Sequence, residues 1–258
     1  MAQQASPDRL PDREAKLGRP MGERRSVQGV VLLLPGGEPR GLRRRSAVSV
    51  AAALPLARRI ARAGQEEALA VHLVHYRYRG WNGAAAHPVA DAEWAVDEVV
   101  RRYGDVSVCL VGTDVGGRAA LRAGGHPAVS AVLAIAPWLP DPADEPGAVE
   151  REPVAQLAGR RVLLVHGTND ERSDPELSYR LAERAKKTNA DVCRFEVHSD
   201  GHGLHQHRAE VTALAEDFVL GTLGGRDFAR PLADALAAPP PLGLRMPLAA
   251  GFGSSLPR

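Results

Sequence analysis

Short, almost wholly apolar runs alternate along this chain with longer segments of helical periodicity, and this alternation limits the possible fold most strongly. The runs span residues 27–34, 68–75, 106–112, 129–136, 160–167 and 191–197. The middle runs are apolar nearly throughout, as a strand must be when both of its faces are covered. Helical patterns lie between and after them. The sequence therefore predicts an α/β fold with a doubly wound, mostly parallel sheet and helices on both faces.

Three of the helical segments carry start, stop or face signals. Ser173 or Asp174 can cap a helix that runs on to residue 187. Residues 88–104 predict a second helix with Gly104 as its stop, and its apolar side comprises Trp94, Ala95, Val99 and Tyr103. Residues 208–223 predict the last helix, with an apolar face of Val211, Leu214, Phe218 and Val219.

The chain of 258 residues is long enough for one domain with a sizeable core. We expect that domain over residues 27–223. Residues 1–26 are polar and Pro-containing, and they predict a disordered tail. Residues 224–258 are rich in Pro and Gly and predict a second tail, because they offer little apolar surface to offset the entropy of ordering.

Composition narrows the partners. The formal net charge of +2 gives no indication of nucleic-acid binding. The longest purely aliphatic run, Val30 to Leu34, is too short to cross a membrane, and the first residues lack a signal-peptide pattern. Cys109 and Cys193 each lie in a strand-like run, which favours two buried thiols over a disulfide. We therefore expect a cytoplasmic protein that acts on a small-molecule substrate; its oligomeric state stays open.

The third strand leads directly into a helix through Gly112-Thr113-Asp114-Val115-Gly116. Glycines two positions on either side of Asp114 permit a tight strand-to-helix turn that projects the central side chain into a cleft. This is the G-x-S-x-G elbow pattern with Asp in place of Ser. The pattern predicts Asp114 as the central catalytic residue.

Two further loops supply partners for Asp114. The fifth strand ends in His166-Gly167-Thr168-Asn169-Asp170, and the sixth is followed by His202 between two glycines. In an open parallel sheet the working residues lie beyond the carboxyl ends of the strands. The chain order of elbow, acid and histidine predicts a relay of Asp114, His202 and Asp170. Other histidines lie nearby, but the cluster lacks Cys and any H-E-x-x-H pattern, so we expect no metal and no cofactor.

The loop after the first strand contains Pro35, Gly36 and Gly37. In this kind of fold that loop supplies one backbone N–H of an oxyanion hole, here from Gly37, and Val115 supplies the other. Gly36 allows the backbone to approach a substrate closely. Tyr78 and Trp81 beside the second strand's loop, with Trp138 after the fourth strand, predict an aromatic-lined substrate mouth, although they can also simply pack the loops.

Together these motifs resemble the α/β-hydrolase superfamily, specifically its small, capless, dienelactone-hydrolase-like enzymes. The resemblance covers about residues 27–222 and depends on the segments 35–37, 77–83, 112–121, 136–140, 166–170 and 200–202. It implies that Asp114 stands at the nucleophile, Asp170 at the acid and His202 at the base. Thr113-Asp114 replaces the usual His-Ser pair. An Asp here resembles haloalkane and haloacetate dehalogenases and epoxide hydrolases, yet the stretch from Trp138 to Arg160 is too short for their helical cap.

Three hypotheses for Asp114 follow. A carboxylate would form an anhydride with an ester substrate, which disfavours ordinary esterase activity. The first hypothesis is hydrolysis of an epoxide or another electrophilic carbon through a covalent Asp114 ester. The second is a lyase, cyclase or isomerase that uses Asp114 and His202 as acid and base. The third is a catalytically silent binding protein that keeps the scaffold.

Overall fold

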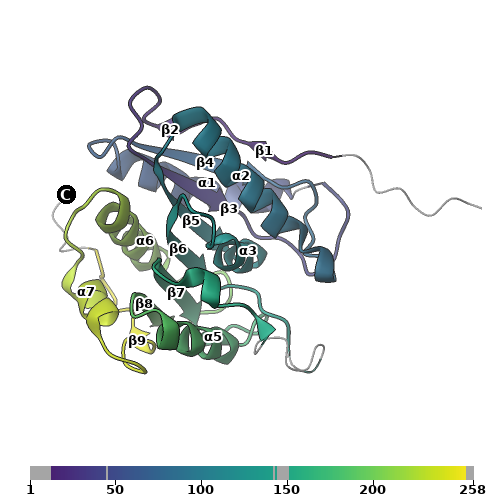
Figure 1. The fold of residues 1–258 in the computed structure, drawn as a ribbon. Helices are drawn as coiled ribbons and strands as arrows, with labels where there is room; N and C mark the ends of the chain where they lie inside the picture. The colour runs from purple at the N-terminus through teal and green to yellow at the C-terminus, as the bar shows by residue number, and fades with distance from the viewer. Residues whose placement is uncertain (1–12, 45, 142, 144–150, 254–258) are drawn as a thin grey trace, which may run out of the picture.

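A single sheet runs through the molecule, in a computed structural model that describes residues 13–44, 46–141, 143 and 151–253 (Figure 1). Its strand order is β1-β4-β3-β5-β6-β7-β8-β9, with β2 also paired to β4. The six central strands are mutually parallel. Their bounds, which confirm the strands predicted from the sequence, are β3 (Gly29–Leu34), β4 (Leu69–His75), β5 (Ser107–Thr113), β6 (Val129–Ile135), β7 (Arg161–Gly167) and β8 (Val192–Val197).

Helices cover both faces of the sheet, and Figure 1 shows the two layers. One apolar core lies between the sheet and α1 (Ala47–Ala63), α6 (Arg208–Leu223) and α7 (Arg230–Ala237). The other lies under α2 (His87–Tyr103), α3 (Val115–Ala123) and α5 (Pro175–Thr188). Strand β3 serves both, since Leu32 belongs to one core and Leu33 to the other. Two short 3₁₀ turns complete these layers, η1 (Gly83–Ala85) and η2 (Ala155–Leu157). The predicted doubly wound sheet is confirmed.

The structure contains the three helices predicted from the sequence, with two differences in detail. Asp174 caps α5 and accepts a hydrogen bond from the Glu176 N–H, whereas Ser173 is buried and donates its hydroxyl to the Pro137 carbonyl. The prediction that Trp94 lies on the buried side of α2 was wrong, because 38% of this residue is exposed. The buried positions of α2 are instead Pro88, Asp91, Ala92, Ala95, Val96 and Val99.

The predicted N-terminal tail was wrong for its described part, residues 13–26; residues 1–12 lie outside the described chain. Strands β1 (Lys16–Leu17) and β2 (Met21–Gly22) both pair antiparallel with β4. The reason is an otherwise open sheet edge, whose carbonyls at Leu69 and Leu73 accept N–H groups from this segment. Such pairing depends on the backbone and leaves little trace in side-chain pattern.

The predicted C-terminal tail was wrong in the same way over residues 224–253; residues 254–258 are not described. This segment forms α7 and then β9 (Met246–Pro247), which adds to the far edge of the sheet beside β8. An edge strand tolerates Pro because its outer side needs no N–H donor. The domain thus extends beyond 27–223 at both ends of the described chain.

Two other observations complete the frame. Cys109 and Cys193 are free and buried, as predicted, on the central strands β5 and β8. The described residues form no large cap domain; residues 142 and 144–150, within the stretch expected to be too short for one, lie outside the description. Within the described chain no helix has both the length and the apolar character needed to cross a membrane.

Candidate active site

Asp114 occupies the tip of a sharp turn between β5 and α3. Its backbone has φ 54° and ψ −124°, a conformation rare for a residue with a side chain. A Cβ atom on Gly112 would collide with the Gly116 carbonyl, and one on Gly116 would collide with the Leu34 carbonyl. Both elbow glycines are therefore required by backbone packing. The Asp114 carbonyl accepts hydrogen bonds from the Gly117 and Trp138 N–H groups, which fixes the turn.

The two carboxylate oxygens of Asp114 have different surroundings. Oδ2 accepts hydrogen bonds from the Gly37 N–H and from Arg172 Nη2, each at 3.1 Å. Oδ1 is buried without a hydrogen-bond partner, and His202 Nε2 is the nearby cationic nitrogen at 3.4 Å. Oδ2 is therefore held by two hydrogen bonds, whereas Oδ1 has only the ion-pair contact with His202.

His202 bridges the two carboxylates that the sequence predicted as its partners. Its Nδ1 lies 2.8 Å from Asp170 Oδ2, while its Nε2 faces Asp114. The loop that carries it is held by Asp200, which is buried and accepts N–H groups from Gly201, Gln206 and His207. The structure thus brings Asp114, His202 and Asp170 together in the predicted order.

Asp170 is the acid member of this group, and both of its oxygens are fully engaged. Oδ1 accepts the backbone N–H groups of Arg172 and Ser173 at 2.8 and 3.0 Å. Oδ2 is shared by His202 and by His166 Nε2, which is 3.0 Å away. Burial opposes ionisation, but hydrogen bonds from the two histidines hold the pKa of Asp170 well below its usual range. Asp170 is therefore a permanent anion.

The charge state of His202 follows from its two neighbours. Burial alone would lower the pKa of His202, but its interactions with the carboxylates of Asp114 and Asp170 outweigh it and raise the pKa to about 9. At neutral pH the resting site therefore holds an imidazolium between two carboxylates. Its Nε2–H points toward Asp114, where it can give up a proton.

The loop after β3 lies against Asp114 as expected. A Cβ on Gly36 would approach Asp114 Oδ2 to 3.1 Å, and one on Gly37 would lie 3.3 Å from the Val115 side chain as well as colliding with the Arg79 carbonyl. Gly37 and Val115, the residues expected to form an oxyanion hole, are therefore neighbours. The Gly37 N–H is already directed at Asp114 Oδ2.

Arg172 was not singled out from the sequence, yet it contacts both carboxylate residues. Its backbone N–H holds Asp170, and its guanidinium donates to Asp114 Oδ2 and to the Gly37 carbonyl, the latter at 3.0 Å. It follows Asp170 by two residues in the loop after β7. The sequence did not reveal this contact, because Arg172 is 58 positions from Asp114 and a surface arginine carries no pattern that indicates its partner.

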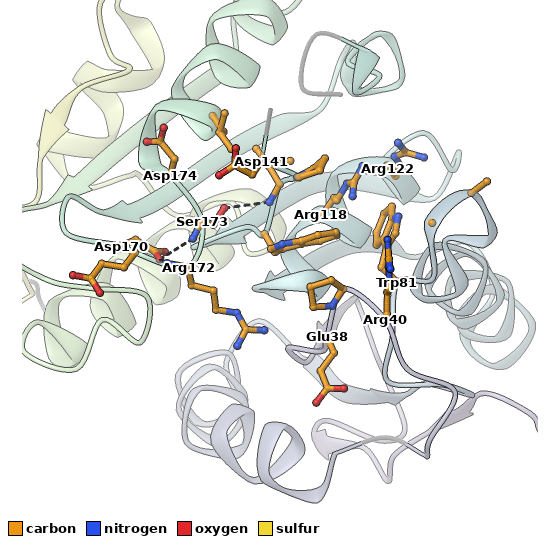
Figure 2. Close-up of a pocket in the computed structure, with 18 residues that line it drawn as sticks. Glu38, Arg40, Trp81, Arg118, Arg122, Asp141, Asp170, Arg172, Ser173 and Asp174 are labelled. Atoms are coloured by element: carbon orange, nitrogen blue, oxygen red, sulfur yellow. Dashed lines mark hydrogen bonds between the residues drawn. The ribbon is translucent and has the colours of Figure 1, made fainter. Parts of the chain in front are cut away.

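A cavity of about 1340 Å³ opens beside this site and is shown in Figure 2. Asp170 and Arg172 contribute to its wall, whereas Asp114 and His202 do not, so Arg172 stands between the cavity and the elbow. Trp81 and Trp138 are among the residues that line it, with ring centroids 6.1 Å apart, and Trp81 is only 3% exposed because it also packs into the core. Tyr78 differs, because it is buried against His87 with ring centroids 4.8 Å apart and does not line this cavity.

An arginine cluster supports the two tryptophans. Arg118 lies over Trp81 at 4.1 Å and over Trp138 at 5.1 Å, and with Arg122 it binds the buried carboxylate of Glu152. Burial opposes ionisation of Glu152, but its hydrogen bonds to Arg122 and Arg118 lower its pKa. The pair Arg118 and Glu152 is 34 residues apart in sequence, and no local pattern indicated it.

The further histidines do not assemble a metal site. His207 Nδ1 lies 3.2 Å from Asp200, and His205 lies beside Arg208. No group of three or more His, Cys, Asp or Glu side chains among the described residues has the arrangement of a metal centre.

Comparison with known proteins gives the fold its name. No protein-family model and no curated protein matches the sequence. Solved structures do match. Est1E from Butyrivibrio proteoclasticus has 14% identity over 81% of this chain and 94% of its own, with a TM-score of 0.59. The Pyrococcus furiosus esterase Pf2001 has 16% identity over 82% and 92%, with a TM-score of 0.57. TT1662 from Thermus thermophilus has 17% identity over 80% and 92%, with a TM-score of 0.58. The sheet, its helices and these neighbours show an α/β-hydrolase fold.

Proposed function

We propose that this α/β-hydrolase-fold protein is a hydrolase that opens an electrophilic sp³ carbon, foremost an epoxide, through a covalent ester on Asp114. The observation that carries the proposal is the asymmetry of the Asp114 carboxylate. Oδ2 is held by the Gly37 N–H and Arg172, while Oδ1 is buried without a hydrogen-bond partner. A desolvated carboxylate oxygen is a stronger nucleophile than a hydrated one, and the strained elbow presents it at the strand end.

In the first half-reaction Asp114 Oδ1 attacks a ring carbon of the epoxide. The carbon–oxygen bond of the ring breaks, and the departing oxygen takes the proton from His202 Nε2. The raised pKa of His202, about 9, supplies that proton at neutral pH. A neutral ester on Asp114 and a neutral imidazole result.

In the second half-reaction His202 acts as a base. Once Asp114 is esterified, the anion that raised the pKa of His202 most directly is gone, so Nε2 can take a proton from water. The hydroxide adds to Cγ of Asp114, and the charge develops on Oδ2, where Gly37 already donates its N–H. Collapse expels the alkoxide, which takes the proton of the new carboxyl group. A diol leaves, and the Asp114 anion and His202 cation are restored.

The surroundings support a substrate with an aromatic part. Trp138 and Trp81, the latter only 3% exposed, lie in the wall of the cavity beside the elbow, and Arg118 lies over both rings. Arg172 lies over Asp114 with its side chain 46% exposed, so we expect a substrate to displace it from Oδ2 on entry. Ester hydrolysis, the activity named for the Pyrococcus furiosus protein Pf2001, is not proposed for this chain, because a carboxylate attacking an ester would form an anhydride.

The test is a single turnover of styrene-type epoxides in ¹⁸O-labelled water. We expect one labelled oxygen in the peptide that contains Asp114, together with diol product. His202→Gln should slow both formation of the alkyl ester on Asp114 and its hydrolysis, because it removes the acid of the first half-reaction and the base of the second. Asp105→Asn is the matched control, since this carboxylate is exposed and precedes the amino end of β5, whereas the elbow follows the carboxyl end. Diol formation without label in Asp114 would exclude the covalent ester.

The charge state of His202 favours one second candidate, acid–base catalysis without a covalent step. An imidazolium with a pKa of about 9, between a permanent anion and Asp114, can protonate a substrate while Asp114 accepts a proton elsewhere. Such a lyase, cyclase or isomerase would give a product without added water. The labelling experiment separates the two, because only the covalent route places solvent oxygen in Asp114.

A further inference from the structure

His166 is a second histidine on Asp170, and the mechanism above does not use it. It lies near the end of β7 with no exposed surface, and its Nε2 is 3.0 Å from Asp170 Oδ2. The same oxygen accepts Nδ1 of His202 at 2.8 Å. Two imidazoles therefore compete for one carboxylate oxygen, which makes each able to change the other's hydrogen bond.

The partners of His166 fix where its proton lies. Nε2 faces only acceptors, Asp170 Oδ2 and the Ser173 carbonyl at 3.1 Å, so Nε2 must carry the hydrogen. Burial lowers the pKa of His166 despite the neighbouring carboxylate, which keeps the ring neutral. Nδ1 must then accept a hydrogen bond.

Ser178 provides that hydrogen bond. Its hydroxyl is 2.8 Å from His166 Nδ1 and also 2.8 Å from the Pro175 carbonyl. Arg194 donates Nε to the Ser178 hydroxyl oxygen and Nη2 to the Pro175 carbonyl, at 3.0 and 3.1 Å. Because Arg194 already satisfies the carbonyl, the serine proton is free to go to His166. Every polar atom of this buried group then has a partner.

The group is anchored by the C-terminal segment. Arg194 is 1% exposed, pairs with Glu196 and donates Nη1 to the Leu244 carbonyl, next to β9. Its charge also faces His166 and contributes to lowering the pKa of that ring, after burial. The remaining charges around Asp170 are His202 and, across it, Asp114 with Arg172.

We propose that His166 is a positioning residue: its Nε2–H shares Asp170 Oδ2 with His202, orients that carboxylate and limits its attraction for the His202 proton. A second N–H donor withdraws electron density from the oxygen, so Asp170 binds the imidazolium of His202 less strongly than it would alone. Asp170 then stays ionised, and the proton stays on His202. The consequence for catalysis depends on the proposed function, whereas the proton positions do not.

The experiment is ¹⁵N and ¹³C NMR of histidine side chains in the substrate-free protein, titrated from acid to alkaline pH. We expect His166 as the neutral Nε2–H tautomer at neutral and alkaline pH. His166→Leu removes the second donor and should raise the pKa of His202 by about 1, whereas His166→Gln, whose side-chain amide can still donate, should leave it within about 0.3. Ser178→Ala removes the hydrogen bond to His166 Nδ1 and should shift the pKa of His202 in the same direction by less.

His72→Leu is the matched control. His72 is also fully buried on a central strand, but its nitrogens contact the Gly18 carbonyl and the Tyr103 hydroxyl, away from Asp170. It should lose stability like His166→Leu without moving the pKa of His202. The proposal is overturned by a His166 ring that is cationic or carries hydrogen on Nδ1. It is also overturned if the pKa of His202 in His166→Leu equals that in the wild type. Should His166→Leu not fold, the same comparison is made between Ser178→Ala and the wild type. If the NMR result holds while no electrophile labels Asp114, the positioning role stands and the proposed chemistry fails.

Discussion

Asp170 and Asp114 flank the same histidine, but their surroundings suit opposite tasks. Asp170 accepts four N–H donors, two on each oxygen, and none of its lone pairs is left for chemistry. Asp114 has two donors on one oxygen and no hydrogen-bond partner on the other. A saturated carboxylate holds a charge in place, while an unsaturated one retains the capacity to attack. Hydrogen-bond supply, rather than residue type, therefore separates the anchor from the proposed nucleophile.

The largest expected effect is on turnover, and the covalent adduct that remains distinguishes the two carboxylates. Asp114→Asn should reduce turnover about 10⁴-fold, since an amide cannot form the ester. Asp170→Asn should slow turnover by a similar factor, about 10⁴, because His202 loses the anion that fixes its tautomer. Mass spectrometry of the protein after one equivalent of epoxide distinguishes them, because only Asp170→Asn should retain an alkyl group on Asp114. An adduct of equal yield in both variants would show that Asp114 is not the nucleophile.

The second expected effect is on folding stability. Asp170→Ala removes an acceptor from the buried His166, from the half-buried His202 and from two loop N–H groups, which should reduce the free energy of unfolding by about 3 kcal/mol. Asp114→Ala should reduce it by less, about 1 kcal/mol, since only the Gly37 N–H, the partly exposed Arg172 and the ion pair with His202 lose their partner, while the backbone strain stays because Ala keeps Cβ. Urea unfolding monitored by Trp fluorescence measures both. Equal losses would contradict the division into anchor and nucleophile.

The contrast also explains what sequence could reveal. The elbow, the acid and the histidine were predicted because each depends on a local pattern: apolar strand, small flanking residues and position at a strand end. Gly112 and Gly116 are needed within the turn itself, so the residues that indicate the turn lie two positions on either side of Asp114 in the sequence. The mostly parallel sheet and its two helical layers followed from the same local periodicities.

What remained hidden depends on long-range contacts. Arg172 reaches Asp114 across 58 positions of sequence, and Glu152 meets Arg118 across 34. The terminal strands contain two residues each and are selected by open sheet edges rather than by their own hydrophobicity. His166 lies in the predicted motif, but its hydrogen bond to Asp170 depends on how the loop after β7 folds back. Such information resides in the assembled fold.

The third expected effect is a pH dependence that belongs to His202. Its folded pKa, about 9, lies above the ordinary value near 6.5. The stabilisation is therefore fully present below about pH 6.5 and is lost as pH rises through about 9. We expect a loss of about 2 kcal/mol across that range in the wild type, after allowing for partial solvent screening.

Asp114→Asn sharpens this prediction because it removes one of the two carboxylates that raise the pKa of His202. The variant should lose only about half as much stability between pH 6.5 and 9.5, while Asp105→Asn should behave like the wild type. Chemical denaturation at several pH values gives the difference directly, since other titrating groups contribute equally to all three proteins. Parallel curves for Asp114→Asn and the wild type would show that Asp114 does not hold the His202 proton.

The smallest expected effect concerns the backbone that carries the nucleophile. Asp114 has φ 54° and ψ −124°, a region that glycine enters without a clash between Cβ and the backbone. Asp114→Gly should therefore raise the free energy of unfolding by about 1 kcal/mol, relative to Asp114→Ala, although it removes the reactive group entirely. The same exchange of Ala and Gly at Asp170 should show no such gain, because that carboxylate is held by hydrogen bonds and its backbone is not among the positive-φ positions of the described chain. A gain at Asp114 alone would show that the backbone strain lies at the proposed nucleophile. A protein that no longer used this carboxylate would have no reason to retain a strained residue there.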